Sequence, residues 1–486
     1  MKTLARHSAV YGLGLILQRL TGFVMVPVYT RFLSPADYGI AELLDLSVWL
    51  AGALTGLGIP TALIRFHAKT DDAQARREIV SSALVAAIVV NAAAACAALL
   101  AAAPLARLVL GDASYAPLVR IAFATFALAA TVEIPMTLLR ARERSALFTK
   151  ISIARLILSL SLNIVFVVGL KMGVLGIMIS GLISTAATGV VLVGLMLRDT
   201  GFSPSRARLG AILRFGAPLV GSSLGMFAIH YGDRYFLRWF GGLSDVGVYA
   251  LAYKFGFGIA LLVQPFEMTW NVRVFSTMAS ADAARTAGRL LALYAALLAW
   301  LVLGLGGLAP EIVRLFAAPA YAAAAAIIPV VALAYLFRHI GEFFRAVYLV
   351  DGNSKWVGAA VTGSAVFGLI AYRILIPPLG TMGAALATLA TFIVLCAVMS
   401  ALGRRSRPIE IEWGALAKAT GAAAASYALL RAIGPADDLA AEPARLAARI
   451  AIVAAYPLVL IAIRFFSAGE VAGARRVIAR RFGARV

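Results

Sequence analysis

The sequence predicts an all-α polytopic membrane protein of about 14 transmembrane helices, grouped as two parallel six-helix lobes followed by two C-terminal helices. Two observations predict the helices and the bilayer. The chain has 486 residues, of which 62% are hydrophobic and only 14% charged, whereas soluble domains are about 45–50% apolar. Apolar runs of about 20 residues, long enough to cross about 30 Å of hydrocarbon, recur along the whole chain. A third observation, an internal repeat, predicts the two lobes.

Each predicted span is an apolar run bounded by charged residues, glycine or proline. All should be helical, because lipid offers no partner to the backbone groups of an open sheet edge. The first two spans are separated only by residues 34–37, and the eleventh and twelfth only around Pro377 and Pro378. In chain order the fourteen spans are 9–33, 38–64, 79–103, 115–139, 147–169, 173–197, 211–232, 244–268, 287–309, 322–344, 356–376, 380–403, 413–434 and 447–466.

The basic residues predict the orientation of these spans. If the N-terminus is cytoplasmic and the spans alternate, most Lys and Arg residues fall on the cytoplasmic side. They include the cluster Arg140, Arg142 and Arg144 and the basic tail at 475–485. This asymmetry is the bias of the positive-inside rule. We therefore expect a multi-pass protein with both its N- and C-termini in the cytoplasm.

An internal repeat predicts how the spans are grouped. The segment 32–44 resembles 241–253, and the segment 171–185 resembles 381–395, at a nearly constant spacing of about 210 residues. A repeat of six helices keeps its orientation in the membrane, so the two halves should be parallel repeats. The predicted regions are an N-terminal six-helix lobe at 1–200, a C-terminal six-helix lobe at 209–408, and two extra helices with a basic cytoplasmic tail at 411–486.

Charged side chains inside the spans are candidates for a functional site, because such residues almost always face a wet cavity or a charged partner. Arg19 is the first, about halfway along the span 9–33, where a charge costs at least about 2.5–3.5 kcal/mol. The others are Glu42, Asp45, Glu133, Arg155, Asp233, Arg234, Lys254, Glu267, Arg338, His339, Glu342 and Arg345.

Other features exclude several classes of protein. The net charge of +21 is spread over short loops, where topology and attraction to anionic headgroups explain it, so we expect no nucleic-acid partner. Cys96 and Cys396 both lie inside spans and imply no disulfide framework. The four histidines are scattered and predict no metal site, and the glycine-rich stretches lack a nucleotide-binding lysine. We expect no enzyme, no catalytic residues and no cofactor.

Three motifs carry a resemblance to a known family: QRLTGF at 18–23, PVYTRFLSPADYG at 27–39 and VGVYALAYK at 246–254. In this order they resemble the polysaccharide (O-antigen, Wzx-type) flippases. That family belongs to the multidrug/oligosaccharidyl-lipid/polysaccharide exporter superfamily, with the lipid II flippase and the multidrug and toxin extruders. The resemblance covers most of the chain. It implies two six-helix lobes around a V-shaped central cavity, lined in part by the first, second, seventh and eighth spans.

The resemblance also implies a function. Flippases of this type move an undecaprenyl-diphosphate-linked oligosaccharide from the cytoplasmic to the outer leaflet of the bacterial cytoplasmic (inner) membrane. They work by alternating access and serve the biosynthesis of lipopolysaccharide O-antigen, capsule or exopolysaccharide. The expected partners are this lipid-linked oligosaccharide, membrane lipids, and a polysaccharide polymerase or ligase complex.

A diphosphate headgroup needs fixed cations, and Arg offers a bidentate fork to phosphate oxygens while Lys acts as a point charge. Arg19, Arg234 and Lys254, in spans expected to line the cavity, are the predicted headgroup ligands. Alternatives stay open for each. Arg19 could instead pair with Glu42 or Asp45, and Arg234, at the end of the seventh span, could extend to the membrane interface.

The acidic residues Glu42, Asp45, Asp233 and Glu267 are candidates either for charge pairs or for coupling to a proton or sodium ion. Glu42 and Asp45 are spaced i,i+3 and should share a helix face. A further set could form either part of a cavity or a structural cluster. Its members are Arg155, near the cytoplasmic end of the fifth span, and the potential intrahelical ladder of Arg338, Glu342 and Arg345.

Three other functions remain open. An ion-coupled multidrug or metabolite antiporter of the same superfamily would favour an acidic cavity, which Glu42, Asp45 and Glu267 could supply. A lipid II flippase would carry a related lipid-linked substrate. A non-transporting scaffold of a polysaccharide assembly complex has no need of charges buried along a cavity, so substitution of those charges should leave it active.

Overall fold

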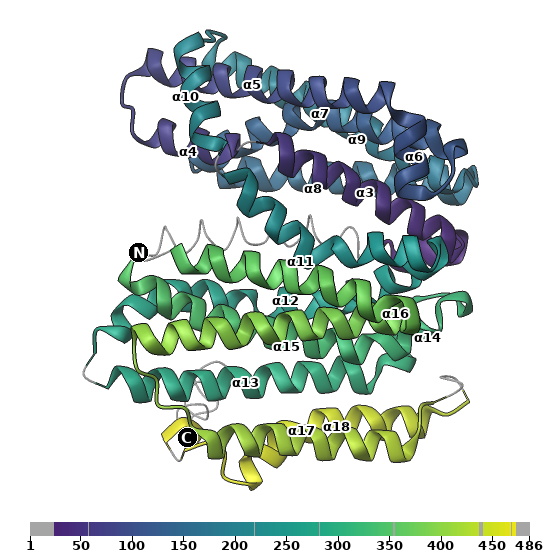
Figure 1. Ribbon diagram of the computed structural model, residues 1–486, viewed down its shortest axis with the longest axis vertical. Helices are drawn as coiled ribbons and strands as arrows, with labels where there is room; N and C mark the ends of the chain where they lie inside the picture. Colours follow the sequence, from purple (N-terminus) through teal and green to yellow (C-terminus); the bar gives the residue numbers. More distant parts are fainter. Residues whose placement is uncertain are drawn as a thin grey trace, which may run out of the picture. The chain divides into compact units, whose positions relative to one another are not determined.

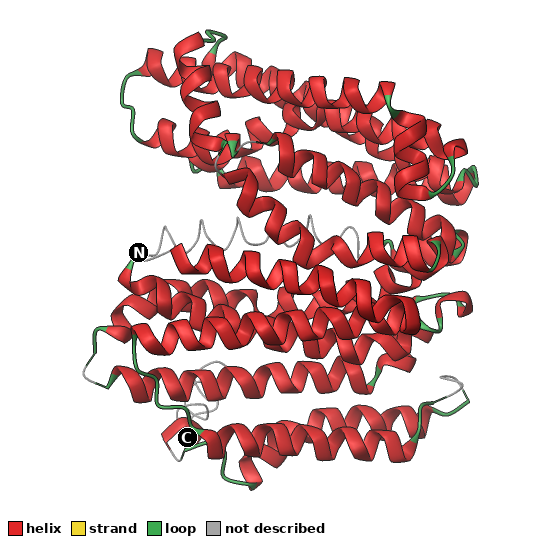
Figure 2. Ribbon diagram, viewed as in Figure 1, coloured by secondary structure: helices red, strands yellow, loops and turns green. Residues whose placement is uncertain are grey.

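The computed structural model describes residues 24–472 except 57, 218, 281, 353–354, 437–440 and 468. These residues form helices joined by short loops, and no strand occurs among them (Figure 2). Ten of the described helices are long and apolar enough to cross a membrane. The predicted all-α, multi-pass class is therefore confirmed.

The number of fourteen spans stays a prediction. Most of the first predicted span lies outside the described residues. The seventh and thirteenth correspond to α11 (Leu219–Phe240) and α17 (Trp413–Ile433), which are not among the ten apolar helices. The eleventh and twelfth are joined in α16 (Lys355–Ser406), whose two helical parts meet at a kink where Gly380 has a φ of 55°.

The chain forms two compact units, described here separately. Unit 1 consists of Met1–Leu251, Phe316–Tyr321 and Val361–Ala387, and unit 2 of the remaining residues. The predicted division into lobes stays a prediction. Besides α11 and parts of α12 (Leu243–Met278) and α16, the helices of unit 1 are α2 (Val26–Phe32), α3 (Pro35–Thr55), α4 (Ile59–Ala68), α5 (Ala73–Leu100), α6 (Ala102–Leu110), α7 (Ala116–Ala141), α8 (Ser145–Asn163), α9 (Gly173–Thr200) and α10 (Arg206–Gly216).

Unit 2 contains the rest of α12 and α16, together with α13 (Ala283–Gly307), α14 (Ala309–Phe316, the last residue of which belongs to unit 1), α15 (Ala324–Tyr348), α17 and α18 (Pro443–Ala462). Within it α13 packs against α15 and α17, and α17 packs against α18 (Figure 1). The two C-terminal helices are thus held to the unit mainly through α13.

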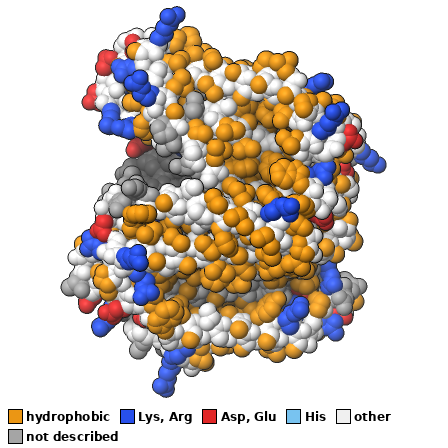
Figure 3. Space-filling view, viewed as in Figure 1, with side chains coloured by type: hydrophobic (Ala, Val, Ile, Leu, Met, Phe, Trp, Pro, Cys, Tyr) orange, Lys and Arg blue, Asp and Glu red, His pale blue; other side chains and the backbone are white. Residues whose placement is uncertain are grey.

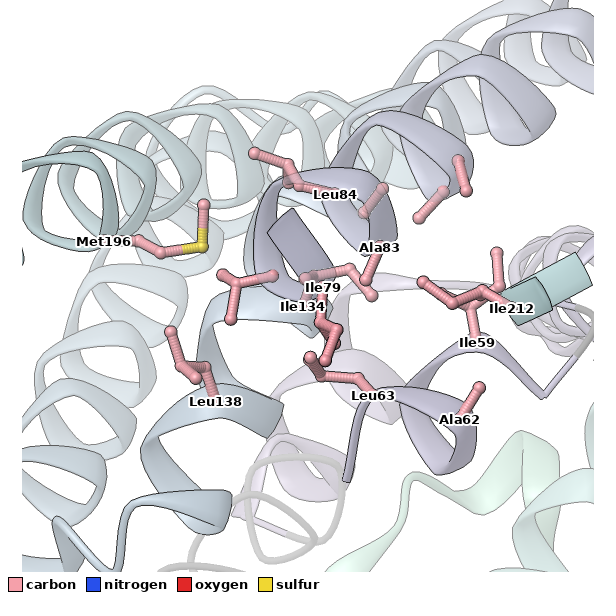
Figure 4. Close-up of a cluster of buried hydrophobic side chains, with 14 residues drawn as sticks. Ile59, Ala62, Leu63, Ile79, Ala83, Leu84, Ile134, Leu138, Met196 and Ile212 are labelled. Atoms are coloured by element: carbon pink, nitrogen blue, oxygen red, sulfur yellow. The ribbon is translucent and has the colours of Figure 1, made fainter. Parts of the chain in front are cut away.

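Alanines interleaved with larger aliphatic residues build a core cluster of unit 1. In Figure 4, side chains of α4, α5, α7, α9 and α10 converge, with Ala83 of α5 lying near Ile134 of α7. Small side chains let helix backbones approach closely, which drives packing where lipid weakens the hydrophobic effect. The strong pairing of α5 with α7 and of α7 with α9 follows from this composition.

The second predicted span, 38–64, is broken in the structure. α3 ends at Thr55, and α4 begins at Ile59 after Gly58, whose φ of 58° lies in the left-handed region that favours glycine. Pro60 follows in the first turn of α4, where its missing N–H costs nothing. The apolar run is continuous, but its glycine and proline end one helix and begin another.

The seventh predicted span, 211–232, is displaced in the structure. The chain forms α10 up to Gly216 and then α11, which continues to Phe240. Asp233 and Arg234 therefore lie within a helix and not at its end, contrary to the prediction. A charged pair normally ends an apolar run, but here both side chains are compensated by partners in unit 1, so the helix can continue through them.

The two copies of the repeated motif contact each other within unit 1. A Cβ added to Gly39 of α3 would lie 2.0 Å from the carbonyl oxygen of Leu243, the first residue of α12. A Cβ added to Gly247 of α12 would lie 1.9 Å from the carbonyl oxygen of Pro35, the first residue of α3. Each helix start thus touches the glycine of the other helix, and only glycine permits this backbone contact.

Exposed hydrophobic side chains cover much of the helical surface. Val190 of α9 is 76% exposed and Val272 of α12 is 74% exposed. Figure 3 shows hydrophobic side chains across much of the face in view, with many Lys and Arg side chains toward its edges. Soluble monomers rarely expose so much apolar surface, and contact with lipid chains accounts for it.

Candidate functional site

Asp233 and Arg234 form a buried charged cluster on α11. Asp233 is 0% exposed and Arg234 is 2% exposed. The guanidinium Nη1 of Arg234 lies 2.7 Å from Asp233 Oδ1 and donates to the carbonyl oxygen of His230 at 2.8 Å. Its Nε lies 3.7 Å from Glu42 Oε1 of α3, and Tyr249 of α12 donates its hydroxyl to Asp233 Oδ2 at 2.6 Å. The cluster therefore joins α3, α11 and α12.

This geometry changes the interpretation of Arg234. Its side chain is buried in protein and does not extend to an interface, and its charge is offset by Asp233 and Glu42. Removing one partner from such a buried cluster leaves an uncompensated charge, which costs about 3–5 kcal/mol. A phosphate bound to the guanidinium would compete with these carboxylates.

Of the other predicted headgroup ligands and their possible partners, the structure describes Glu42, Asp45 and Lys254. Arg19 lies outside the described residues, so its predicted role and its pairing with Glu42 or Asp45 stay predictions. Glu42 instead lies beside Arg234 from α11, while Asp45 is exposed one turn further along α3. Lys254 is half-buried in α12, eleven residues after the helix begins, and belongs to unit 2.

Glu267 and His339 form a second buried polar group, in unit 2. The Nδ1 atom of His339 on α15 lies 2.6 Å from Glu267 Oε1 on α12, and Tyr294 of α13 donates its hydroxyl to the same oxygen at 3.3 Å. His339 is 1% exposed, and its Nε2 has no hydrogen-bond partner among the described residues. The sequence placed both residues among the charged candidates inside the spans, but their pairing was not predicted because they lie on different helices.

The predicted ladder on α15 is only half present. Arg345 donates to Glu342 at 2.6 Å, as the i,i+3 spacing predicts. Arg338 forms no ion pair with Glu342 among the described residues, and its guanidinium lies 5.8 Å from the ring centre of Tyr335. Helical spacing permits both contacts of the ladder, but Arg338 instead lies over Tyr335, three residues earlier on the same helix.

Arg155 lines a cavity of about 380 Å³ inside unit 1. It is the eleventh residue of α8, and its predicted position near the cytoplasmic end of the fifth span stays a prediction. Glu133 and Arg140 of α7 line the same cavity, with Thr185 of α9. Neither Glu133 nor Arg155 forms a salt bridge with any residue that the structure describes. Both charges were singled out from the sequence, but it was not predicted that α7 and α8 bring them to one cavity.

An apolar groove of about 670 Å³ also lies in unit 1, with a wall that is almost free of polar groups. It is lined by helices α3, α5, α6, α7, α11 and α16, including Leu54, Leu105 and Phe236. The two cavities flank the same part of α3, since Ser47 lines the groove and Val48 lines the charged cavity.

A third polar cluster ties the C-terminal helices to α13. Arg289 donates to Glu470 at 2.6 and 2.8 Å, to Glu412 at 3.0 Å and to the carbonyl oxygen of Phe465 at 2.8 Å. The Arg289 guanidinium holds the pKa of the Glu470 carboxyl down at about 2. These contacts connect segments far apart in the chain and indicate a structural role.

Within the described part of the chain, no group of three or more His, Cys, Asp or Glu side chains could hold a metal ion. Cys96 and Cys396 are free thiols. The described side chains do include groups suited to binding anions, Arg155 with Arg140 and Arg234, and a carboxylate–imidazole pair, Glu267 with His339.

Comparison with known proteins gives both a family and a fold. The sequence model of a family described as "Polysaccharide biosynthesis protein" matches residues 4–272, more than half of the chain. No curated protein matches the sequence. Solved structures of the same fold include a lipid II flippase, MurJ, in an inward closed conformation. It has 14% sequence identity and a TM-score of 0.75, with 94% of this chain and 99% of that chain covered.

Two further structures of this fold are multidrug transporters. An inward-facing multidrug resistance MATE family transporter of the MOP superfamily has a TM-score of 0.62 and 18% identity, covering 80% of this chain and 94% of that chain. A variant of the Vibrio cholerae MATE transporter VcmN has a TM-score of 0.60 and 15% identity, covering 83% of this chain and 96% of that chain. At these identities the likeness shows the fold alone.

Proposed function

Because the chain belongs to the polysaccharide biosynthesis protein family, we propose that it is a flippase for a lipid-linked oligosaccharide. The substrate is an undecaprenyl-diphosphate-linked glycan, carried from the cytoplasmic to the outer leaflet of a bacterial inner membrane for the synthesis of a surface polysaccharide. The family match carries the proposal, and the fold shared with a lipid II flippase supports it. Both termini lie in the cytoplasm, and a polymerase or ligase complex receives the product.

Transport proceeds by alternating access, with the diphosphate held by fixed cations while the hydrophilic glycan crosses inside the protein. Arg19, Arg234 and Lys254 are the proposed headgroup ligands. The closed cluster around Arg234 supports a specific coupling: a phosphate that displaces Glu42 would break the only ion pair between α3 and α11 found among the described residues. Binding of substrate would then release α3 to move against α11.

Coupling to an ion gradient is proposed at Glu267 and His339. The 2.6 Å contact places a carboxylate and an imidazole, two groups that can each carry a proton, on two different helices of unit 2. Protonation of Glu267 would break its pairing with His339 and loosen α12 from α15. Sodium binding to the Glu267 carboxylate is the alternative, and transport driven by a pH gradient or a sodium gradient distinguishes the two.

The test is rescue of a deletion strain. We would measure surface polysaccharide and the leaflet that holds the lipid-linked precursor, then restore wild type, Lys254→Ala and Arg234→Ala at matched membrane abundance. The proposal expects precursor to accumulate on the cytoplasmic face and only wild type to clear it. Arg120→Gln, a charge removed from an exposed site on α7, serves as the control and should clear it as wild type does.

The second candidate is an ion-coupled multidrug antiporter, favoured by the fold shared with MATE transporters and by the acidic Glu267. In that case the deletion leaves the precursor distribution unchanged and raises sensitivity to cationic drugs. A lipid II flippase would instead cause lipid II to accumulate. If the charge variants restore polysaccharide as well as wild type does, the protein acts as a scaffold of the assembly complex and transport is excluded.

A further inference from the structure

We infer that the charged cavity of unit 1 is a binding site for a glycosyl diphosphate, in which Arg155 and Arg140 hold the phosphates and Glu133 holds a sugar hydroxyl. This inference rests on the proposed function and adds to it the site that recognises the phosphate–sugar junction of the substrate. None of the three residues belongs to the predicted headgroup set of Arg19, Arg234 and Lys254.

The cavity is built by the regular spacing of residues on α7. Thr125, Ala129, Glu133, Met136 and Arg140 recur every three or four residues and so form one stripe along the helix, and all of them line the cavity. Glu133 and Arg140 are seven residues apart, or about 10 Å along the helix axis. The opposite wall comes from Arg155 of α8 and Thr185 of α9, so charged groups approach the same space from different helices.

The charges of this cavity lack the compensation seen elsewhere in the chain. Around Arg234 one guanidinium faces two carboxylates, whereas here two guanidiniums face a single carboxylate, Glu133. Arg140 donates to Thr137 at 2.9 Å, and Arg155 forms no ion pair with the described residues. Arg155 is half-buried within the candidate span Ser145–Gly169, where a charge is costly unless it meets water or a ligand, so a net positive cavity favours an anion.

The size and walls of the cavity restrict the ligand further. A volume of about 380 Å³ lies at the lower end of the range of about 300–1,000 Å³ for ligand pockets, enough for a diphosphate with one sugar but not for an oligosaccharide. Buried Phe126, Val132 and Phe148 form apolar walls, while Glu133 and Arg140 are exposed, so a ligand can reach them. Arg forks suit phosphate oxygens, and a carboxylate accepts hydrogen bonds from sugar hydroxyls.

The test measures binding of farnesyl diphosphate, a short polyprenyl diphosphate, to the full-length protein in detergent by microscale thermophoresis. Arg155→Gln should weaken binding about tenfold or more, because a charge-assisted hydrogen bond pair is lost, and Arg155→Lys should recover part of it. Glu133→Gln should have the opposite effect and tighten binding several-fold, since it removes the one negative charge beside the phosphates. Arg120→Gln, on α7 like Glu133 but outside the cavity lining, should bind as wild type does.

A merely structural role of these residues cannot produce effects of opposite sign, so Glu133→Gln decides the question even if Arg155→Gln fails to fold. Inorganic pyrophosphate and farnesol, measured alongside, separate a site for free diphosphate or for the lipid chain from one for the lipid headgroup. The inference is wrong if Arg155→Gln and Glu133→Gln both bind like wild type, or if farnesol binds as tightly as farnesyl diphosphate. In that case, translocation of a lipid-linked glycan by the wild-type protein would still support the flippase. Conversely, if farnesyl diphosphate binds with the expected charge dependence but the wild-type protein translocates no lipid-linked glycan, the proposed function is wrong and the binding site stands.

Discussion

Replacing Gly247 with alanine should force α3 and α12 apart at the contact between the two copies of the repeated motif. The new Cβ would lie 1.9 Å from the carbonyl oxygen of Pro35 and 2.8 Å from its carbonyl carbon, whereas ordinary contacts begin at 3.4 Å. The helix starts must therefore separate by roughly 1.5 Å, because a backbone carbonyl cannot rotate away as a side chain can. Overpacking of this kind costs about 1–3 kcal/mol.

Alanine also gains up to about 1 kcal/mol over glycine from helix propensity, so the expected net loss of stability is up to about 2 kcal/mol. Thermal unfolding of the purified protein in detergent measures it as a lowered melting temperature. Gly194→Ala in α9 is the matched control: it has the same gain in propensity, no heavy atom lies within 4 Å of its new Cβ, and it should melt at or slightly above wild type.

The reciprocal geometry adds a sharper expectation. Gly39→Ala should cost a similar amount, because its Cβ would lie 2.0 Å from the carbonyl oxygen of Leu243. The double variant should cost less than the sum of the two, since one separation of the helices relieves both clashes. A melting temperature of Gly247→Ala equal to that of Gly194→Ala, or strictly additive effects in the double variant, would refute the reasoning.

Three other predictions follow from the polar clusters. Arg234→Met should cost about 3–5 kcal/mol in thermal unfolding, because it leaves the carboxylate of Asp233 buried without its cation, and an unchanged melting temperature would contradict this. The pKa of Glu470 is lowered to about 2, so its contact with Arg289 contributes stability that is fully present above about pH 4.5 and is lost as the pH falls toward 2. The difference in melting temperature between wild type and Glu470→Gln should therefore shrink on acidification over that range, and a difference independent of pH would exclude the contact as its source. Arg449→Met should loosen α18, since Arg449 donates to carbonyl oxygens of α13 and α17 and pairs with Glu311 at 2.7 Å. Limited proteolysis after residue 433 should therefore be faster than in wild type. Equal cleavage rates would contradict the role of Arg449 in holding α18.

Composition and the length of apolar runs were enough to predict the helical, multi-pass class, and the motifs at 18–23, 27–39 and 246–254 carried the resemblance to a polysaccharide family; both predictions are confirmed. The same signals failed where a helix breaks inside an apolar run, as at Gly58, or continues through a charged pair, as at Asp233. Hydropathy averages over such residues, whereas a left-handed glycine or a buried counter-ion decides the local conformation.

The partners of the charged residues could not be predicted, because they lie far apart in the chain. Arg234 meets Glu42 across 192 positions of sequence, and Glu267 meets His339 across 72. The i,i+3 pair of Glu342 and Arg345 was predictable, since helical geometry alone brings it together. The cavity of Arg155 arises only when α7, α8 and α9 pack, and no local pattern encodes it.

Translocation by the purified protein tests the central claim most directly. The full-length chain would be reconstituted into liposomes containing an undecaprenyl-diphosphate-linked oligosaccharide with a labelled sugar, and a membrane-impermeant glycosidase would report the fraction of substrate in the outer leaflet over time. The account predicts that wild type exchanges the substrate between leaflets far faster than protein-free liposomes, and that Lys254→Ala slows this exchange while Arg120→Gln does not. Exchange no faster than in protein-free liposomes, with the protein folded and a pH gradient imposed, would contradict the assignment as a flippase.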